Sequence, residues 1–228
     1  MTAGTNESAL RREICRVGRS LYERRYVHAS AGNISVRLPQ EGGHGGGFLI
    51  TPTDACLGTL QPERLARVDA DGTQTGGDPA SKTLLLHQRI YEAEPAAHCV
   101  VHTHSPNLVA LTLQGVWHHD DIVPPITPYF VMKVGHVPLI DYRLPGHPDA
   151  AGAVVQRIVA MQQRGTPIRA VMLERLGPVV WHRTPAEASA VLEELEETAA
   201  LWRGCEPKPA PLSNEQIDAL RQRFGAVW

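Results

Sequence analysis

Apolar residues recur along this chain with two periods, one typical of helices and one typical of strands. A first amphipathic helix is predicted by four apolar residues at helical spacing among arginines: Leu10, Ile14, Val17 and Leu21. Alternation predicts a hairpin of strands at 34–38 and 48–51, and a strand at 99–104 that leads into a helix from Pro106. The later elements that we predict are strands at 137–140, 170–173 and 179–181, and helices that begin near Leu84, Pro148, Pro185 and Ser213.

Helices and strands mix throughout, which predicts an α/β layered fold. The hairpin and the short connections favour a mixed, largely antiparallel sheet over a doubly wound parallel one. A length of 228 residues suits a single domain over 1–228. Within it, a proline-rich linker at 204–212 leads to the last helix. The glycine-rich run at 42–47 is predicted to be a loop, because no helix start or Lys-Ser/Thr pair follows it.

Composition narrows the class of partner. The formal net charge is −2, so no overall positive field favours nucleic acid. No apolar run is long enough to span a membrane, and the N-terminus lacks the apolar core of a signal peptide. Four scattered cysteines without a Cys-x-x-Cys motif indicate free thiols. We therefore expect a cytoplasmic protein.

The first candidate for chemistry is the pair His102 and His104. A strand puts both imidazoles on one face, next to the start of a helix. Zinc and related ions take imidazole nitrogen at about 2.0–2.1 Å and need three or four ligands in all. The pair is thus half of a metal site, or simply two polar residues at the end of a strand.

Candidate anion-binding groups lie at other element ends. They are backbone N–H groups and an amide at Gly32-Asn33, hydroxyls at Thr51 and Thr53, and a helix start at Ser81-Lys82. Each by itself is more often a turn or an ordinary capped helix. Together, at neighbouring ends of paired strands, they predict one polar cradle.

In combination and order, these motifs resemble the class II aldolase/adducin family, and within it the 3-oxo-tetronate 4-phosphate decarboxylases. The residues that carry the resemblance are Gly32-Asn33-Ile34-Ser35, Ile50-Thr51-Pro52-Thr53, Ser81-Lys82 with His87, and Val101-His102-Thr103-His104. The closer likeness lies in 51–58 and 126–135.

The resemblance implies a three-layer α/β/α fold and a homotetramer with active sites between subunits. It implies a lyase that acts on a small sugar phosphate or sugar-acid phosphate, held by residues like Gly32, Asn33, Thr51, Thr53, Ser81 and Lys82. It also implies a divalent metal, expected to be zinc, on two histidines like His102 and His104, a third histidine and a glutamate. The metal would act as a Lewis acid on the enediolate that remains after C–C cleavage.

Two metal-site positions depart from the family pattern. The glutamate, which also serves as acid or base, falls at Thr83, or at Lys82 in the other alignment, so these two residues stand at the catalytic position. The third histidine falls at Leu176. Glu174 is the best substitute ligand. It lies two residues before Leu176, which on a strand puts both side chains on one face. His147 and His182 are alternatives, and a salt bridge to an arginine is the ordinary role for Glu174.

Three functions therefore compete. The first is a metal-dependent lyase or decarboxylase with a rebuilt site, which we take as the family-level function. The second is a non-catalytic binding or scaffold protein on the same fold. The third is an iron-dependent oxidative decarboxylase, for which two histidines and one carboxylate suffice.

Overall fold

The computed structural model describes residues 7–41 and 44–228, and the chain divides into two compact units. The first unit runs to His104 and includes 181–189. The second consists of 105–180 and 190–228. The single-domain boundary expected from the sequence stays a prediction.

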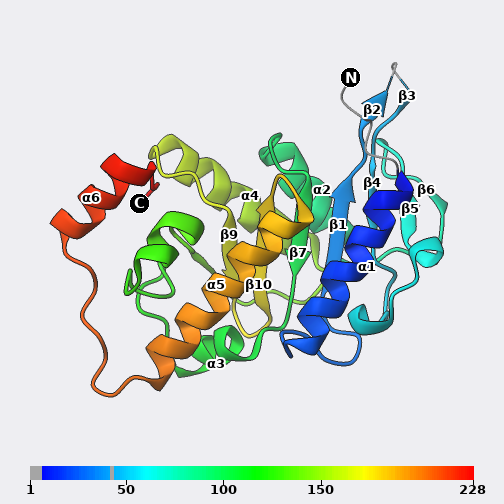
Figure 1. Cartoon of the computed structure of the whole chain (residues 1–228). Coiled ribbons are helices and arrows are strands. Elements are labelled where there is room, and N and C mark those ends of the chain that lie inside the picture. Colours follow the sequence, from blue (N-terminus) through cyan, green and yellow to red (C-terminus); the bar gives the residue numbers. More distant parts are fainter. Residues whose placement is uncertain (1–6, 42–43) are drawn as a thin grey trace. The chain divides into compact units, whose positions relative to one another are not determined.

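Five antiparallel strands form the sheet of the first unit, in the order β6-β5-β4-β1-β7 (Figure 1). Their bounds are β1 Asn33–Arg37, β4 Phe48–Ile50, β5 Ala66–Val68, β6 Gln74–Gly76 and β7 Cys99–His102. β1 lies between β4 and β7, so the predicted hairpin partner of β1 is confirmed. The strands β5 and β6, which are three residues long and flanked by polar turns, were not predicted from the sequence.

The helices α1 and α2 lie wholly within the first unit. The first, α1 (Glu7–Glu23), buries Ile14, Val17 and Leu21, as their spacing predicts. The second is α2 (Leu84–Ala93). Short 3-10 turns occupy Leu57–Thr59 and Pro62–Arg64. Part of the glycine-rich run pairs in a short ladder, β2 (Gln40–Glu41) with β3 (His44–Gly45), whereas 42–43 lie outside the described residues.

The second unit contains a parallel pair, β8 (Leu139–Ile140) with β9 (Ala170–Leu173). β9 also pairs antiparallel with β10 (Gly177–His182), so the ladders are mixed, as predicted. The helices are α3 Pro106–Gln114, α4 Pro148–Gln163, α5 Pro185–Gly204 and α6 Asn214–Phe224, with a π turn at Phe130–Val134. In the described part of the chain, no helix is long and apolar enough to cross a membrane.

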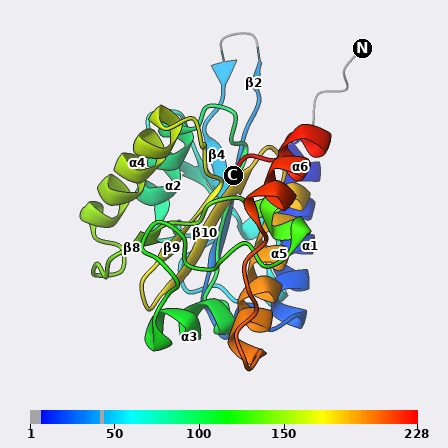
Figure 2. The ribbon, with the colours of Figure 1, turned by 90° about the vertical axis from the view of Figure 1, so that its left-hand side faces the viewer.

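Caps explain where several helices begin. Ser213 and Gln216 form a complete capping box at α6. At α5, Glu187 N donates to the Thr184 hydroxyl, and this hydroxyl donates to the Glu187 carboxylate, so half of a capping box forms. The proline-rich linker runs as an extended trace between α5 and α6 (Figure 2).

A buried carboxylate takes the place of a local cap at α3. The Ser105 side chain makes no capping bond there, and Pro106 occupies the first helical turn. Instead, Asn107 N and Leu108 N donate to the Glu196 carboxylate of α5, at 2.8 and 3.1 Å. Burial raises the pKa of Glu196, while these donors act in the opposite direction.

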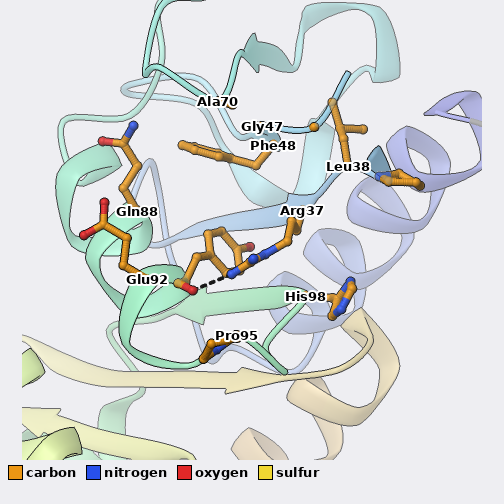
Figure 3. A pocket seen from close by; sticks show the side chains of 12 residues that line it. Arg37, Leu38, Gly47, Phe48, Ala70, Gln88, Glu92, Pro95 and His98 are labelled. Carbon is orange, nitrogen blue, oxygen red and sulfur yellow. Dashed lines mark hydrogen bonds between the residues drawn. The ribbon is translucent and has the colours of Figure 1, made fainter. Parts of the chain in front are cut away.

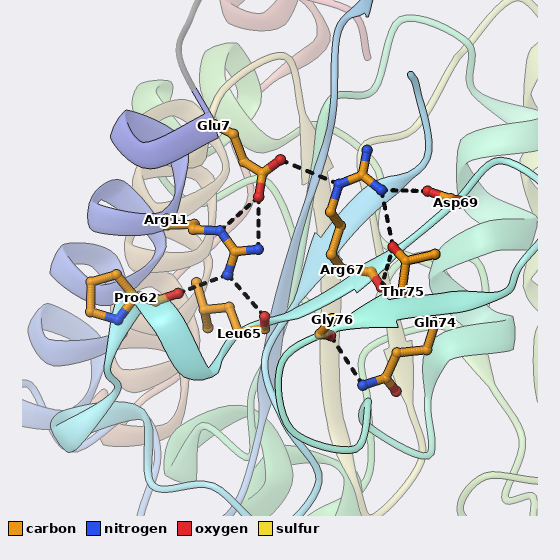
Figure 4. Close-up of polar contacts among 9 residues, drawn as sticks. All are labelled: Glu7, Arg11, Pro62, Leu65, Arg67, Asp69, Gln74, Thr75 and Gly76. Carbon is orange, nitrogen blue, oxygen red and sulfur yellow. Dashed lines mark hydrogen bonds and ion pairs between the residues drawn. The ribbon is translucent and has the colours of Figure 1, made fainter. Parts of the chain in front are cut away.

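An arginine of α1 ties this helix to the segment before β5. Arg11 Nη1 donates to the Pro62 and Leu65 carbonyls at 2.8 and 2.9 Å, and Arg11 pairs with Glu7 (Figure 4). Glu7 also pairs with Arg67 of β5. The Arg11 side chain is only 16% exposed, so these bonds are partly protected from water.

We predict that Arg11→Ala lowers the free energy of unfolding by about 1–3 kcal/mol, because two carbonyls lose a charged donor. Urea unfolding followed by circular dichroism measures this. The matched control is Arg12→Ala, since Arg12 is exposed and its guanidinium bonds Ser8 of the same helix. A shift of the same size for both variants would contradict the prediction.

Candidate functional site

The two histidines of the His-x-His motif lie together. β7 ends at His102, and His104 follows two residues later. Their ring centroids are 5.1 Å apart and the rings are inclined by 62°. His102 is 2% exposed, and His104 is of intermediate exposure. Burial, followed by the charge of His28, lowers the pKa of His104, so its neutral, ligand-competent form is favoured at neutral pH.

The spacing of these rings suits two ligands of one ion. Nitrogen–zinc distances of about 2.0–2.1 Å with tetrahedral angles leave two ring centroids roughly 5 Å apart. However, among the residues that the structure describes, no group of three or more His, Cys, Asp or Glu side chains could hold a metal. Within the described ranges, the histidine pair is therefore the part of such a site that the structure brings together.

The expectation that Glu174 shares a strand face with Leu176 is wrong. β9 ends at Leu173 and β10 begins at Gly177, so 174–176 form the tight turn between them. Glu174 accepts a hydrogen bond from Tyr142 N at 2.9 Å and lies 3.6 Å from the Arg175 guanidinium. Ligation of a metal by Glu174 stays a prediction.

The two alternative histidines already have partners. His147 Nδ1 accepts from Asp149 N at the start of α4, at 3.3 Å. His182 Nδ1 lies 2.9 Å from a Glu187 carboxylate oxygen. Both rings therefore have structural contacts that a ligand role would have to replace.

Backbone bonds bring the predicted hydroxyls together. Thr53 N donates to Pro79 O at 2.8 Å, and Ser81 N donates to Thr51 O at 3.2 Å, so 51–53 runs antiparallel to 79–81. The fully buried Thr51 hydroxyl accepts from Ile34 N at 3.1 Å, which joins the end of β4 to β1. The structure thus places Thr51, Thr53 and Ser81 near the start of β1.

Gly32, just before β1, needs to be glycine. Its φ is +84°, and a Cβ there would lie 2.8 Å from the His102 carbonyl oxygen and 2.9 Å from Val27. The backbone of Gly32 therefore passes directly beside the histidine motif. Asn33 follows, and its Cα partner across the β1–β7 ladder is His102.

The start of α2 lies later than the helix start expected at Ser81-Lys82. The N-cap residue is Thr83, without a capping bond from its side chain. Ser81 Oγ lies 3.0 Å from Thr83 Oγ1 and accepts from Thr83 N at 3.4 Å, a local turn. Lys82 is exposed immediately before the helix N-terminus. Lys82 is therefore open to an anion, whereas Ser81 is buried and its hydroxyl already contacts Thr83.

A buried row of polar side chains, not predicted from the sequence, supports Asn33. Asn33 Oδ1 lies 2.6 Å from His87 Nε2, and His87 Nδ1 lies 2.7 Å from Ser35 Oγ. Ser35 Oγ lies 2.7 Å from Tyr91 Oη. A signal was present in the sequence, since Asn33 and Ser35 alternate on one strand while His87 and Tyr91 are four apart on one helix.

Burial keeps the titratable side chains of this polar chain, His87 and Tyr91, in their neutral forms. His87 is fully buried, and desolvation, with a smaller contribution from His102, lowers its pKa to about 3. The imidazole is therefore neutral at neutral pH. Desolvation likewise raises the pKa of Tyr91 well above its ordinary value.

Two hollows lie in the first unit. One of about 400 Å³ borders Thr53 and the Arg64–Asp78 ion pair. Another of about 460 Å³ is lined by residues that include Arg37, Phe48, Tyr91 and His98 (Figure 3). The first adjoins the predicted cradle, and the second shares only Tyr91 with the buried polar chain.

Residues 12–202 match the model of the Class II Aldolase and Adducin N-terminal domain. The chain is 52% identical over 229 residues to a 3-oxo-tetronate 4-phosphate decarboxylase of Cupriavidus necator, covering 98% of this chain and 100% of that protein. It is 41% identical over 196 residues to the protein of the same name from Escherichia coli K12, covering 86% of each.

Solved structures agree in fold. YgbL from Escherichia coli superposes with a TM-score of 0.82 at 38% identity, over 94% of this chain and 99% of that one. An L-fuculose 1-phosphate aldolase reaches a TM-score of 0.78 at 19% identity, over 95% and 96%. These likenesses confirm the predicted α/β fold with a mixed, largely antiparallel sheet.

We predict that acid destabilises this protein partly through His87. Because its folded-state pKa of about 3 lies below the ordinary 6.5, the unfolded chain binds more protons between these values, and stability falls as the pH falls through that window. Between pH 7 and pH 4.5, protonation linked to His87 should lower the free energy of unfolding by roughly 2–3 kcal/mol.

Urea unfolding between pH 7 and 4.5 measures this loss. His87→Gln should lower stability at pH 7 and flatten its dependence on pH, because the titrating group is gone. His98→Gln, which changes an exposed histidine, is the control. An unaltered pH dependence in His87→Gln would contradict the assignment.

Proposed function

This chain belongs to the class II aldolase and adducin family, and we propose that it decarboxylates a 3-oxo sugar acid that carries a phosphate group. The observation that carries the proposal is the 52% identity, over essentially the full length of both chains, to a protein named for this reaction. The cluster of hydroxyl, amide and ammonium groups around the start of β1 supports the same class of substrate.

The chemistry follows from the substrate class. In a 3-oxo acid, the bond between C1 and C2 breaks and its electron pair enters an enolate over C2 and C3, with release of CO₂. A proton added at C2 then gives the ketone. For a four-carbon acid with a phosphate on C4, the product is a three-carbon hydroxyketone phosphate. Catalysis therefore requires an anchored phosphate and stabilisation of the enolate oxygen on C3.

We assign the anchoring to the polar cradle predicted from the sequence. Gly32, Asn33, Thr53, Ser81 and Lys82 supply N–H, hydroxyl and ammonium donors, which suit phosphate oxygens. Thr51 supports them from behind, because its hydroxyl already accepts from Ile34 N. Thr83, at the family's glutamate position, cannot act as a carboxylate base, so we assign it to holding the Ser81 hydroxyl.

We assign stabilisation of the enolate to the imidazoles of His102 and His104. N–H groups of His102 and His104 are able to donate to the developing oxyanion, and Lys82 adds positive charge. The family expectation of a divalent ion, zinc on His102 and His104 with Glu174, stays a prediction. Such an ion would supply Lewis acidity when bound. A ring nitrogen that held such an ion could not also donate to the enolate, whereas the role of Lys82 would be unchanged.

Assembly and location extend the proposal. A homotetramer with the polar cradle at subunit contacts is expected from the family resemblance. The four free cysteines are consistent with a reducing compartment, so we infer a cytoplasmic enzyme. Light scattering at micromolar protein concentration tests the assembly, and a monomer would contradict it.

The central experiment measures CO₂ release and hydroxyketone phosphate formation from 3-oxo-tetronate 4-phosphate. Wild-type protein should yield both products in equal amounts, above the spontaneous rate. Assays with added Zn²⁺, Fe²⁺ or chelator separate the metal-dependent alternatives. Binding of the substrate without any turnover would instead support the non-catalytic alternative.

We predict that Lys82→Ala raises the KM for the phosphorylated substrate about 10- to 100-fold, because a charged donor to phosphate is lost. Competitive inhibition by inorganic phosphate should weaken in parallel. Arg89→Ala is the matched control, since Arg89 is an exposed cation on α2 that pairs with Glu92. Equal KM values for wild type and Lys82→Ala would refute this role.

A further inference from the structure

Only one assignment of donors and acceptors fits the polar chain behind Asn33. The Asn33 Oδ1 can only accept, so His87 Nε2 carries the proton in the contact of 2.6 Å. In a neutral imidazole the other nitrogen, Nδ1, is then an acceptor, and Ser35 Oγ donates to it. The hydroxyl of Ser35 is thereby used as a donor and accepts from Tyr91.

The phenol of Tyr91 continues the same order. Because the Ser35 hydroxyl donates its only hydrogen to His87, Tyr91 donates to Ser35 Oγ. The three contacts therefore run in one direction, from Tyr91 through Ser35 and His87 to Asn33.

The amide nitrogen of Asn33 remains outside this chain. Asn33 Nδ2 donates to no atom among residues 7–41 and 44–228. In that part of the chain, the side-chain polar atoms that are both fully buried and without a hydrogen-bond partner are Arg37 Nε and Trp181 Nε1. Asn33 Nδ2 is not one of them, so it is not fully buried. Asn33 is 5% exposed, so its amide nitrogen is among the few atoms of this residue that solvent or a ligand reaches.

We propose that His87 is a positioning residue that holds Asn33 with its oxygen inward and its NH₂ outward, so that Asn33 offers only donors to an anionic oxygen of the substrate. Asn33 lies across the ladder from His102, which places these donors beside the histidine motif. A free asparagine could present either its acceptor or its donors, whereas this one cannot rotate without breaking a buried hydrogen bond. The inference rests on the proposed function, because it takes the ligand to be the phosphate or carboxylate of that substrate.

The test is a double-mutant cycle with Asn33→Ala and His87→Leu, read as KM for the substrate and as Kd for inorganic phosphate by calorimetry. Each single variant should raise both constants roughly 10- to 100-fold, the effect of losing a hydrogen bond to a charged group. The double variant should be no worse than Asn33→Ala alone, because His87 acts through Asn33. The effect on kcat should be smaller than the effect on KM.

Two further variants separate positioning from folding. His87→Gln keeps an N–H donor for Asn33 and should recover most of the phosphate affinity that His87→Leu loses. Tyr91→Phe removes only the distant donor and should cost less than either. Unfolding midpoints of all variants identify any that fail to fold. If His87→Leu does not fold, near wild-type phosphate affinity in His87→Gln and Tyr91→Phe supports the inference, and a large loss of affinity in His87→Gln overturns it.

Additive effects of Asn33→Ala and His87→Leu on phosphate affinity would overturn the inference, as would wild-type affinity in His87→Leu. Failure of the wild-type protein to bind phosphate would overturn it too. Coupled phosphate binding without CO₂ release would uphold the inference and refute only the proposed decarboxylation.

Discussion

The candidate site depends on the register of one antiparallel pair, β1 with β7. This register sets Asn33 opposite His102, and side chains opposite each other point to the same face of a sheet. A slip of one residue would turn Asn33 and Ser35 to the other face and leave His87 without either partner. The closeness of Gly32 to the His102 carbonyl and the Thr51 bond to Ile34 hold the same strand end from both sides.

Burial of His87 and Ser35 is tolerated because both side chains have hydrogen-bond partners. His87 and Ser35 are fully buried, and both have donors and acceptors at 2.6–2.7 Å. An unmatched polar group in such a place would cost about 1–3 kcal/mol. The interior of the first unit thus combines an apolar core with one specific polar arrangement, which favours a single packing of α2 on the sheet.

The sequence predicted most of the fold and part of the site. Apolar periodicity identified α1 and β9, and cap residues identified α6, because these signals are local. The strands β5 and β6 escaped prediction because three-residue strands carry too few positions to show alternation. The proposed face shared by Glu174 and Leu176 failed because the strand ends at Leu173, and a tight turn cannot be distinguished from a strand by spacing alone. His87 was noticed only as a motif residue, since its partners come from a different element and are set by tertiary packing.

The fixed direction of the hydrogen bonds from Tyr91 to Asn33 has an electrostatic consequence. Every N–H or O–H dipole in this row turns its positive end toward Asn33, and hydrogen bonds in a row polarise one another. The strand end therefore attracts anions through aligned neutral groups as well as through the ammonium of Lys82. Mobile ions screen an exposed ammonium strongly but have no access to dipoles inside the core. High ionic strength should thus erode only the long-range guidance of the substrate, while short-range selectivity for a negatively charged oxygen persists.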